Sequence, residues 1–293
     1  MTPRRLAGVF VPIATPFDPG RGDLVAAAFR ENIERLLAAG LDGILVAGST
    51  GEAALLDPAE QDTLVRWARA AIPKDRWLLV GTGAESTRQA IALTRAAATA
   101  GADAVLVRPP GYFTPMLAPA QLGDYYRAVA DASPIPVLVY NIPKYTHIAV
   151  PPEVLQDLAR HERIIGVKDS SGDPKNLAAY RAAVPQWSVL VGSASLLYQA
   201  LELGCDGGVV GAACFAAADC VALYQAFRAG DKVRARALQE RIGPLDKQIV
   251  GALGPAGIKA AMDAVGLHGG PPRAPLMPLA AADRERVARL VVA

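Results

Sequence analysis

The 293-residue chain has few of the residues that build disulfide frameworks or metal sites. Its three cysteines are odd in number and form no C-x-x-C motif, and its three histidines lie far apart in the sequence. We therefore expect reduced, structural thiols, no assembled metal site and no metal cofactor. The residues in question are Cys205, Cys214, Cys220, His147, His161 and His268.

Neither sign of charge dominates, and the sequence has no basic cluster. Thirty Lys and Arg against 28 Asp and Glu give a formal charge of +2, which favours neither nucleic acid nor an anionic membrane as a partner. The uncharged stretch over residues 187–201 is too short and too polar to span a bilayer. Pro12 and Pro16 interrupt an N-terminal segment that otherwise imitates a signal peptide, so we expect a first strand there. These features predict a cytoplasmic protein with a small-molecule partner.

Short β-branched runs alternate with longer stretches whose apolar residues recur at helical spacing. The first helical stretch ends at Gly40, and DPAE (57–60) and STRQ (86–89) each place a capping residue three positions before Glu or Gln. Each strand is therefore expected to be followed by a helix. The eight runs cover residues 9–15, 43–49, 77–83, 104–110, 136–143, 164–171, 188–194 and 207–213.

Eight strand–helix units in a chain of this length predict a closed (β/α)₈ barrel of the α/β class, a TIM barrel. An open doubly wound sheet is the rival, but no run is followed by the G-x-G-x-x-G turn of dinucleotide-binding sheets. Beyond residue 215 the pattern is only helical. We expect residues 1–215 to form the barrel and residues 216–293 to form a helical extension packed on it within the same structural unit.

The expected active site lies at the carboxyl ends of the strands, where barrel enzymes build their sites. In the stretch IIGVKDSSGD (164–173), Lys168 follows a mostly apolar run. If Ile165 or Val167 faces the helices, Lys168 points into the barrel. It then either pairs with a carboxylate such as Asp169, or stands in an apolar cage as a partly uncharged amine that attacks a ketone to form an imine.

Other strand ends offer the groups that imine chemistry needs. Tyr140 ends the fifth run, where a phenol can relay protons, although a packing role is also open. Ser49 and Thr50 lie in GSTGE (48–52), whose hydroxyls and backbone amides suit a carboxylate, as they would suit a tight turn.

GSTGE, YNIP (140–143) and GVKDSSGD (166–173), in this order, resemble the dihydrodipicolinate synthase and N-acetylneuraminate lyase family of class I, Schiff-base-forming aldolases. The likeness extends from Val11 to RAPLMPL at Arg273. It implies Lys168 as the imine-forming residue, Tyr140 as proton relay, and Ser49 with Thr50 as binders of the pyruvate carboxylate. It also implies that Tyr112 completes the relay in a neighbouring subunit, although PPGYF (109–113) departs from the family's TPYY-like stretch. Glu52 is interpreted as structural.

The residues that contact the second substrate distinguish the branches of this family. The arginine that grips the aldehyde's carboxylate in the synthase of lysine biosynthesis is replaced by Tyr145, although Lys144 precedes it. Sialic acid lyases carry an acidic pair after the strand-seven glycine, whereas Gly192 is followed here by SASLL. The resemblance is greatest to 4-hydroxy-2-oxoglutarate aldolase, which yields pyruvate and glyoxylate.

Two further interpretations stay open. One is the dihydrodipicolinate (4-hydroxy-tetrahydrodipicolinate) synthase itself or a 2-keto-3-deoxy sugar acid aldolase or dehydratase, and the other is a non-catalytic 2-oxo acid sensor. The resemblance further implies no cofactor beyond the covalent imine and a homotetramer built as a dimer of dimers. The expected substrate-binding residues are Ser49, Thr50, Ser170, Gly192, Ser193 and Val209, with helix capping as the alternative for Ser170, Ser193 and Ser195.

Overall fold

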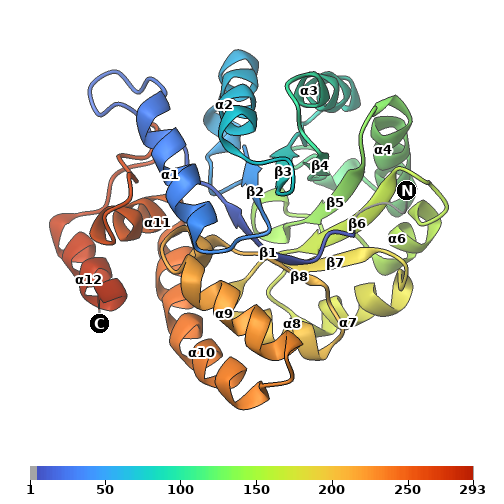
Figure 1. Ribbon diagram of the computed structural model, residues 1–293. Coiled ribbons are helices and arrows are strands. Elements are labelled where there is room, and N and C mark those ends of the chain that lie inside the picture. Colours follow the sequence, from blue (N-terminus) through green and yellow to red (C-terminus); the bar gives the residue numbers. More distant parts are fainter. Residues whose placement is uncertain (1–4, 293) are drawn as a thin grey trace.

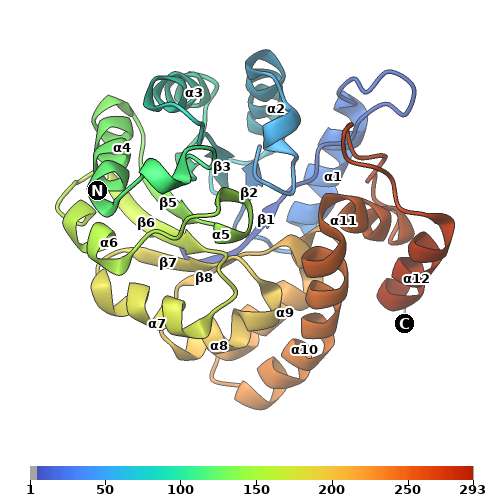
Figure 2. The same cartoon turned by 180° about the vertical axis from the view of Figure 1, so that it is seen from behind.

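The computed structural model describes residues 5–292 and shows eight parallel strands closed into a barrel, with helices around it (Figures 1 and 2). Each strand pairs with the next along the chain, and β8 pairs with β1. The predicted (β/α)₈ barrel with a C-terminal helical segment is confirmed. Residues 1–4, which include part of the basic start, and residue 293 lie outside the described residues.

All eight predicted runs contain a strand, but each strand ends before its run does. Most of the residues left over are small, and they lie in the loops and short helices that follow the strands at the barrel mouth. The strands are β1 Gly8–Pro12, β2 Gly43–Val46, β3 Trp77–Gly81, β4 Ala104–Val107, β5 Val137–Asn141, β6 Ile164–Asp169, β7 Ser188–Val191 and β8 Gly207–Val209.

Two of the helices that follow the strands, α2 and α3, begin at the predicted capping signals. Asp57 and Glu60 form a reciprocal capping box at the start of α2, and Ser86 accepts a hydrogen bond from the Gln89 backbone N–H at the start of α3. The barrel helices are α1 Ala26–Ala38, α2 Pro58–Ala71, α3 Thr87–Thr99, α4 Pro119–Ala132, α5 Pro143–Thr146, α6 Pro152–Leu158, α7 Pro174–Ala183, α8 Leu197–Glu202 and α9 Ala217–Arg228.

The C-terminal segment packs against this ring of helices. It consists of α10 Lys232–Leu245, the π-helix η5 Asp246–Gly251, α11 Ala252–Ala264 and α12 Ala281–Val292. α10 packs on α9, and η5 contacts the short helix η4 (Gly211–Cys214) that follows β8. The predicted division at residue 215 falls between β8 and α9, although α9 itself contacts β1. That division stays a prediction.

Buried side chains form two clusters, one inside the barrel and one between the barrel and its helices. Along β5, Leu138 and Tyr140 belong to the inner cluster, whereas Val137 and Val139 belong to the outer one. This is the alternation expected of a strand with both faces covered. The direction of a site residue therefore depends on its parity along the strand.

Strand β6 carries an irregularity that turns Lys168 inward. Val137 pairs with Ile164 while Leu138 pairs with Gly166, so Ile165 is an extra residue, as in a β-bulge. Ile164 and Val167 both lie in the outer cluster, which a regular strand would not allow for residues three apart. Val167 faces the helices as expected, but Ile165 does not, because it packs against the inner cluster. If the same residues alternated regularly, Lys168, four positions after Ile164, would share the outward direction of Ile164.

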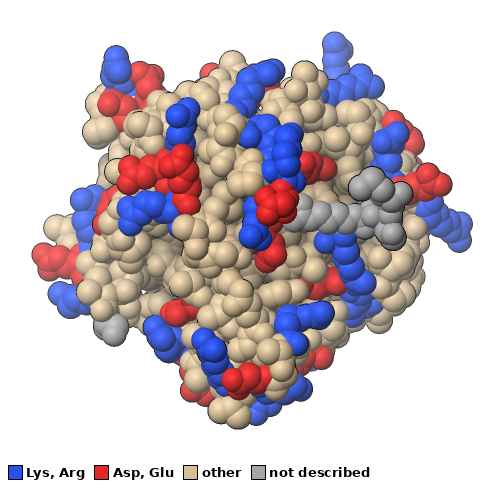
Figure 3. Space-filling model, in the orientation of Figure 1, with Lys and Arg blue, Asp and Glu red and all other residues tan. Residues whose placement is uncertain are grey.

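The charge distribution, the helix lengths and the thiols of residues 5–292 bear on the sequence expectations. Acidic and basic side chains are intermixed over the face in Figure 3. None of the helices in residues 5–292 is both long and apolar enough to cross a bilayer. The three cysteines are free and buried, and burial raises the pKa of Cys205 and of Cys214 to about 12.

Candidate active site

A cavity of about 280 Å³ opens at the carboxyl ends of the strands. It contains eight of the nine residues predicted from the sequence, and Tyr112 is the exception. The eight are Ser49, Thr50, Tyr140, Lys168, Ser170, Gly192, Ser193 and Val209. They come from loops and strands spread over most of the barrel sequence, so the closed sheet is what brings them together.

Lys168 and Tyr140 lie at the base of this cavity on paired positions of β6 and β5. Lys168 is 4% exposed and Tyr140 is 6% exposed. Nζ of Lys168 donates a hydrogen bond to the Tyr140 hydroxyl at 3.3 Å and lies 4.3 Å from the centre of its ring. Among residues 5–292 no carboxylate forms an ion pair with Lys168, so the sequence alternative of a simple salt bridge does not describe this lysine.

Asp169, the sequence neighbour expected as an alternative partner for Lys168, instead binds side chains of other residues. Its carboxylate accepts hydrogen bonds from the Asn141 and Asn176 side-chain amides at 2.7 and 3.0 Å and from the Ser171 hydroxyl at 2.8 Å. Burial raises the pKa of Asp169, and these hydrogen bonds oppose the shift. The network joins the ends of β5 and β6, one residue beyond Tyr140 and Lys168.

A buried ion pair between Glu52 and Lys259 stabilises the turn that carries Ser49 and Thr50. Glu52 adopts left-handed backbone angles (φ 58°), and its Oε1 lies 2.6 Å from Nζ of Lys259 on α11. Its other oxygen accepts a hydrogen bond from the Arg273 backbone N–H at 2.8 Å. Burial lowers the pKa of Lys259, although the nearby Glu52 carboxylate opposes that effect. The interpretation of Glu52 as a structural residue agrees with these contacts.

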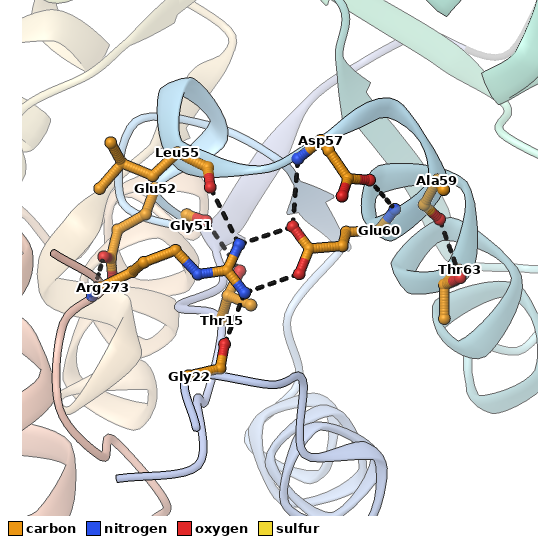
Figure 4. A network of polar contacts seen from close by, with 10 residues as sticks. All are labelled: Thr15, Gly22, Gly51, Glu52, Leu55, Asp57, Ala59, Glu60, Thr63 and Arg273. Atoms are coloured by element: carbon orange, nitrogen blue, oxygen red, sulfur yellow. Dashed lines mark hydrogen bonds and ion pairs between the residues drawn. The ribbon is translucent and has the colours of Figure 1, made fainter. Parts of the chain in front are cut away.

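Arg273 extends this support to the start of α2 (Figure 4). Its guanidinium donates to both carboxylate oxygens of Glu60 at 2.6 Å, and to the carbonyls of Leu55 and Gly22. The hydrogen bond from Arg273 lowers the pKa of the Glu60 carboxyl. The loop after β2 is therefore tied to the C-terminal segment on both sides.

Ser170 and Gly192 lie in contact on the loops after β6 and β7. A Cβ added to Gly192 would lie 1.8 Å from the Ser170 hydroxyl oxygen, so only glycine leaves room for this serine. Gly192 N–H also donates to the Asp169 carbonyl at 2.7 Å. A larger residue at position 192 would therefore displace the Ser170 side chain from its place in the cavity wall.

Sequence reasoning missed the part of the cavity wall supplied by η5 and α11. Asp246, Val250, Gly251, Gly254, Pro255 and Ile258 line it. Gly254 has backbone angles outside the helical region (φ 58°, ψ −144°) and kinks the segment over the barrel mouth. The signal in the sequence is the run GALGPAG (251–257), whose glycines and proline interrupt an otherwise helical pattern.

Lys144 and Tyr145 both line the same cavity, on the short helix after β5. Nζ of Lys144 donates to the Gly251 carbonyl at 2.9 Å, and Tyr145 is 48% exposed. Burial of its hydroxyl end raises the pKa of Tyr145. A phenol therefore lies at the position where the resemblance implies an arginine in the synthase, and a cation lies one residue before it.

Tyr112 lies outside this cavity. It is 78% exposed beside Phe113 and near Met116, which are 67% and 75% exposed. The Glu85 carboxylate accepts hydrogen bonds from the backbone N–H groups of Gly111 and Tyr112 and pairs with Arg108. A second hollow of about 490 Å³, beside α4, includes Phe113 but none of the nine predicted site residues. Within one chain, Tyr112 is not joined to Tyr140 or Thr50.

The described residues contain no group of three or more His, Cys, Asp or Glu side chains placed to hold a metal ion. The polar groups of the cavity are instead the amines of Lys144 and Lys168, hydroxyls, backbone amides and one carboxylate. This set can form a covalent bond to a carbonyl carbon, bind a small anion and move protons.

Known proteins that are similar in sequence and in structure indicate the same family as the sequence motifs do. The model of the dihydrodipicolinate synthetase family matches residues 5–293. The 4-hydroxy-tetrahydrodipicolinate synthase of Syntrophus aciditrophicus is 35% identical over 285 residues, 97% of each chain. An uncharacterized DapA-like lyase of Halobacterium salinarum is 37% identical over 282 residues, 96% of this chain and 92% of that protein. The structure of YagE, a prophage protein of E. coli K12 from the dihydrodipicolinic acid synthase family solved with pyruvate, superposes with a TM-score of 0.92 at 29% identity, covering 98% of this chain and 97% of that one.

Proposed function

This chain belongs to the dihydrodipicolinate synthetase family, and from that premise we propose that it is a lyase whose Lys168 forms an imine with pyruvate. The observation that supports Lys168 is its position: a buried amine with no ion-pair partner among the described residues, 3.3 Å from the Tyr140 hydroxyl, at the base of the cavity.

The proposed reaction begins with attack of the free Lys168 amine on the 2-oxo carbon of pyruvate. The oxygen leaves as water, and the protonated imine draws electrons from the methyl carbon, which loses a proton to give an enamine. The enamine carbon then bonds to the carbonyl carbon of the second substrate, whose oxygen takes up a proton. Water finally releases the product, and the reverse sequence is cleavage. Tyr140 is the proposed relay for these protons, and the Ser49–Thr50 turn holds the pyruvate carboxylate.

The second substrate separates the candidates within the family. Of the two candidates, the relatives named 4-hydroxy-tetrahydrodipicolinate synthase favour a synthase-type condensation over the 4-hydroxy-2-oxoglutarate aldolase suggested by the sequence. Lys144 in the cavity supplies a cation in place of the missing arginine, which also supports this order. We therefore place the condensation of pyruvate with an aldehyde first, and cleavage to pyruvate and glyoxylate second.

Trapping with pyruvate and borohydride tests the proposal. Reduction should add the mass of the pyruvate adduct irreversibly to the tryptic peptide that carries Lys168. Lys168→Arg keeps the charge but should abolish labelling, whereas Lys144→Arg, a matched control in the same cavity, should still be labelled. Labelling at Lys144, or none in the wild type, would defeat the assignment. Trapping without turnover on any aldehyde or 4-hydroxy-2-oxo acid would favour the sensor interpretation.

We also propose that the working unit is at least a dimer, most simply a dimer of dimers, and that no metal or nicotinamide takes part. The 78% exposure of Tyr112, whose backbone N–H donates to Glu85, supports a role in a neighbouring chain rather than beside its own Tyr140. Co-refolded Lys168→Arg and Tyr112→Phe chains should regain part of the activity that each lacks. An active monomer in sedimentation would contradict this, and inhibition by EDTA that zinc reverses would contradict the metal-free reaction. The cytoplasmic location stays a prediction.

A further inference from the structure

Asp246, which the sequence did not single out, lies buried in the cavity wall and binds two serines of the loop after β7. It is 4% exposed and stands at the first position of the π-helix η5. Its Oδ2 accepts hydrogen bonds from the Ser193 hydroxyl at 2.6 Å and from the Ser195 backbone N–H at 2.9 Å. Ser193 and Asp246 both line the cavity. The acidic group that the strand-seven loop lacks in sequence is thus supplied from η5.

These contacts fix the direction of the Ser193 hydroxyl. An ionised carboxylate can only accept hydrogen bonds, so the Ser193 proton points to Asp246. The Ser195 hydroxyl, 2.8 Å away, is then the donor in its contact with Ser193. One lone pair of the Ser193 oxygen remains, and Ser193 is partly exposed to the cavity. The Ser193 oxygen therefore presents a hydrogen-bond acceptor, and not a donor, to the cavity.

The second carboxylate oxygen of Asp246, Oδ1, is buried without a hydrogen-bond partner within residues 5–292. An unpaired, buried carboxylate oxygen costs stability, so its presence calls for an explanation. π-Helical turns such as η5 are common at functional sites. Because Oδ1 is enclosed, contact with a ligand falls to Ser193, and Asp246 acts through Ser193 and through its charge.

We propose that Ser193, positioned by Asp246, accepts a hydrogen bond from a hydroxyl or an ammonium group on the second substrate. This rests on the proposed imine function. A carboxylate at the same point would meet an acceptor lone pair and a nearby negative charge, and both disfavour it. The site therefore selects an aldehyde that carries a hydrogen-bond donor, and it discriminates against glyoxylate.

Four small aldehydes that differ in one group can test this selection with the intact enzyme and saturating pyruvate. They are propanal, glycolaldehyde, aminoacetaldehyde and glyoxylate. The measurement is kcat/KM for each aldehyde, followed by pyruvate consumption. We expect the wild type to favour glycolaldehyde or aminoacetaldehyde over propanal by about tenfold, the size of one net hydrogen bond. The better of the two identifies the donor as hydroxyl or ammonium.

Two variants separate positioning from loss of fold. Ser193→Ala removes the acceptor and should erase the donor preference. Asp246→Asn keeps both hydrogen bonds to the serines but removes the charge, so the preference should fall about threefold or more while glyoxylate gains relative to propanal. KM for pyruvate should stay within about twofold of wild type in both, because the pyruvate half of the site is untouched. Asp231→Asn, the same substitution at the N-cap of α10, should change none of these ratios.

The outcomes distinguish this inference from the proposed function. If borohydride traps pyruvate on the wild type and both variants, but the donor preference is absent in the wild type or unchanged in Ser193→Ala, the acceptor site is wrong while the imine stands. Wild-type preference for glyoxylate would equally overturn it. Failure to trap pyruvate on the wild type would overturn the imine function itself. Because the readout is a ratio between substrates, a partly unfolded variant cannot imitate the expected result.

Discussion

Replacing Lys259 by methionine should destabilise the protein more than any surface charge change, because it leaves Glu52 buried and largely unpaired. The side chains of Lys259 and Glu52 are 1% and 0% exposed, and their contact at 2.6 Å is an ion pair rather than a well-directed hydrogen bond. Removing one partner of a buried ion pair lowers the free energy of unfolding by about 3–5 kcal/mol. After the change, Glu52 would retain the Arg273 backbone N–H as its donor.

The expected shift in melting temperature follows from the length of the chain. Unfolding entropy of about 2.1 cal/mol/K per residue gives roughly 0.6 kcal/mol/K for 293 residues. A loss of about 3–5 kcal/mol then lowers Tm by about 5–8 °C, measured by calorimetry at fixed protein concentration. The Glu52 N–H donates a hydrogen bond to the Ser49 carbonyl, so the Glu52–Lys259 ion pair stabilises the turn proposed to bind pyruvate. KM for pyruvate should therefore also rise in Lys259→Met.

A control and a double variant make this prediction refutable. Lys232→Met breaks an exposed contact of 3.4 Å with Glu202, and such pairs contribute about 0–1 kcal/mol, so Tm should change by less than about 2 °C. Adding Glu52→Gln to Lys259→Met removes the unpaired charge and should restore part of the lost stability. The reasoning fails if Lys259→Met melts within about 1 °C of wild type, or if the double variant is no more stable than the single one.

Three further predictions concern the site and its support. Tyr140→Phe should still be trapped with pyruvate but turn over about 10²- to 10⁴-fold more slowly if the phenol relays protons; a rate within about threefold of wild type would make it a packing residue. Gly166→Ala places a Cβ 2.6 Å from the Ser188 carbonyl oxygen, so it should cost about 1–3 kcal/mol in thermal unfolding and slow borohydride trapping, and an unchanged melt would exclude the tight fit. The pKa of Glu60 is lowered from 4.5 by Arg273, so its contribution to stability is present above pH 4.5 and is lost as the pH falls through the lower folded value. Glu60→Gln should therefore lower Tm at pH 7 and flatten its fall below pH 4.5, and parallel Tm curves for the two proteins would refute the assignment.

The strands and the position of the lysine were predictable because both depend on local composition. Buried parallel strands read as β-branched runs, and a lysine at the end of such a run stands out against them. The loops at the barrel mouth were assigned to the strands, because residues such as Gly192 and Ser193 continue the run without a break in polarity pattern. The direction of Lys168 depended on more than alternation. The extra residue Ile165 reverses the parity of β6, and only the pairing with β5 reveals it.

The contribution of the C-terminal segment was not predictable from periodicity. Helical spacing in residues 232–264 predicts which face of each helix is apolar. It does not predict that a π-helical turn places Asp246 beside Ser193, or that Lys259 contacts Glu52. Those contacts join residues that are distant in sequence, and no local pattern marks either partner. A kink signal was present in GALGPAG, yet it identifies a break and not the wall of a cavity.

These contacts also support the prediction that the helical extension belongs to the same structural unit as the barrel. Lys259 and Arg273 hold the turn proposed to bind pyruvate, from one side of the mouth. Asp246 holds the loop proposed to select the second substrate, from another side. The two halves of the proposed reaction site thus depend on one C-terminal segment, and neither would keep its geometry in a barrel that ended after β8. A change in η5 can therefore alter the choice of aldehyde while Lys168, Tyr140 and the imine chemistry stay as they are.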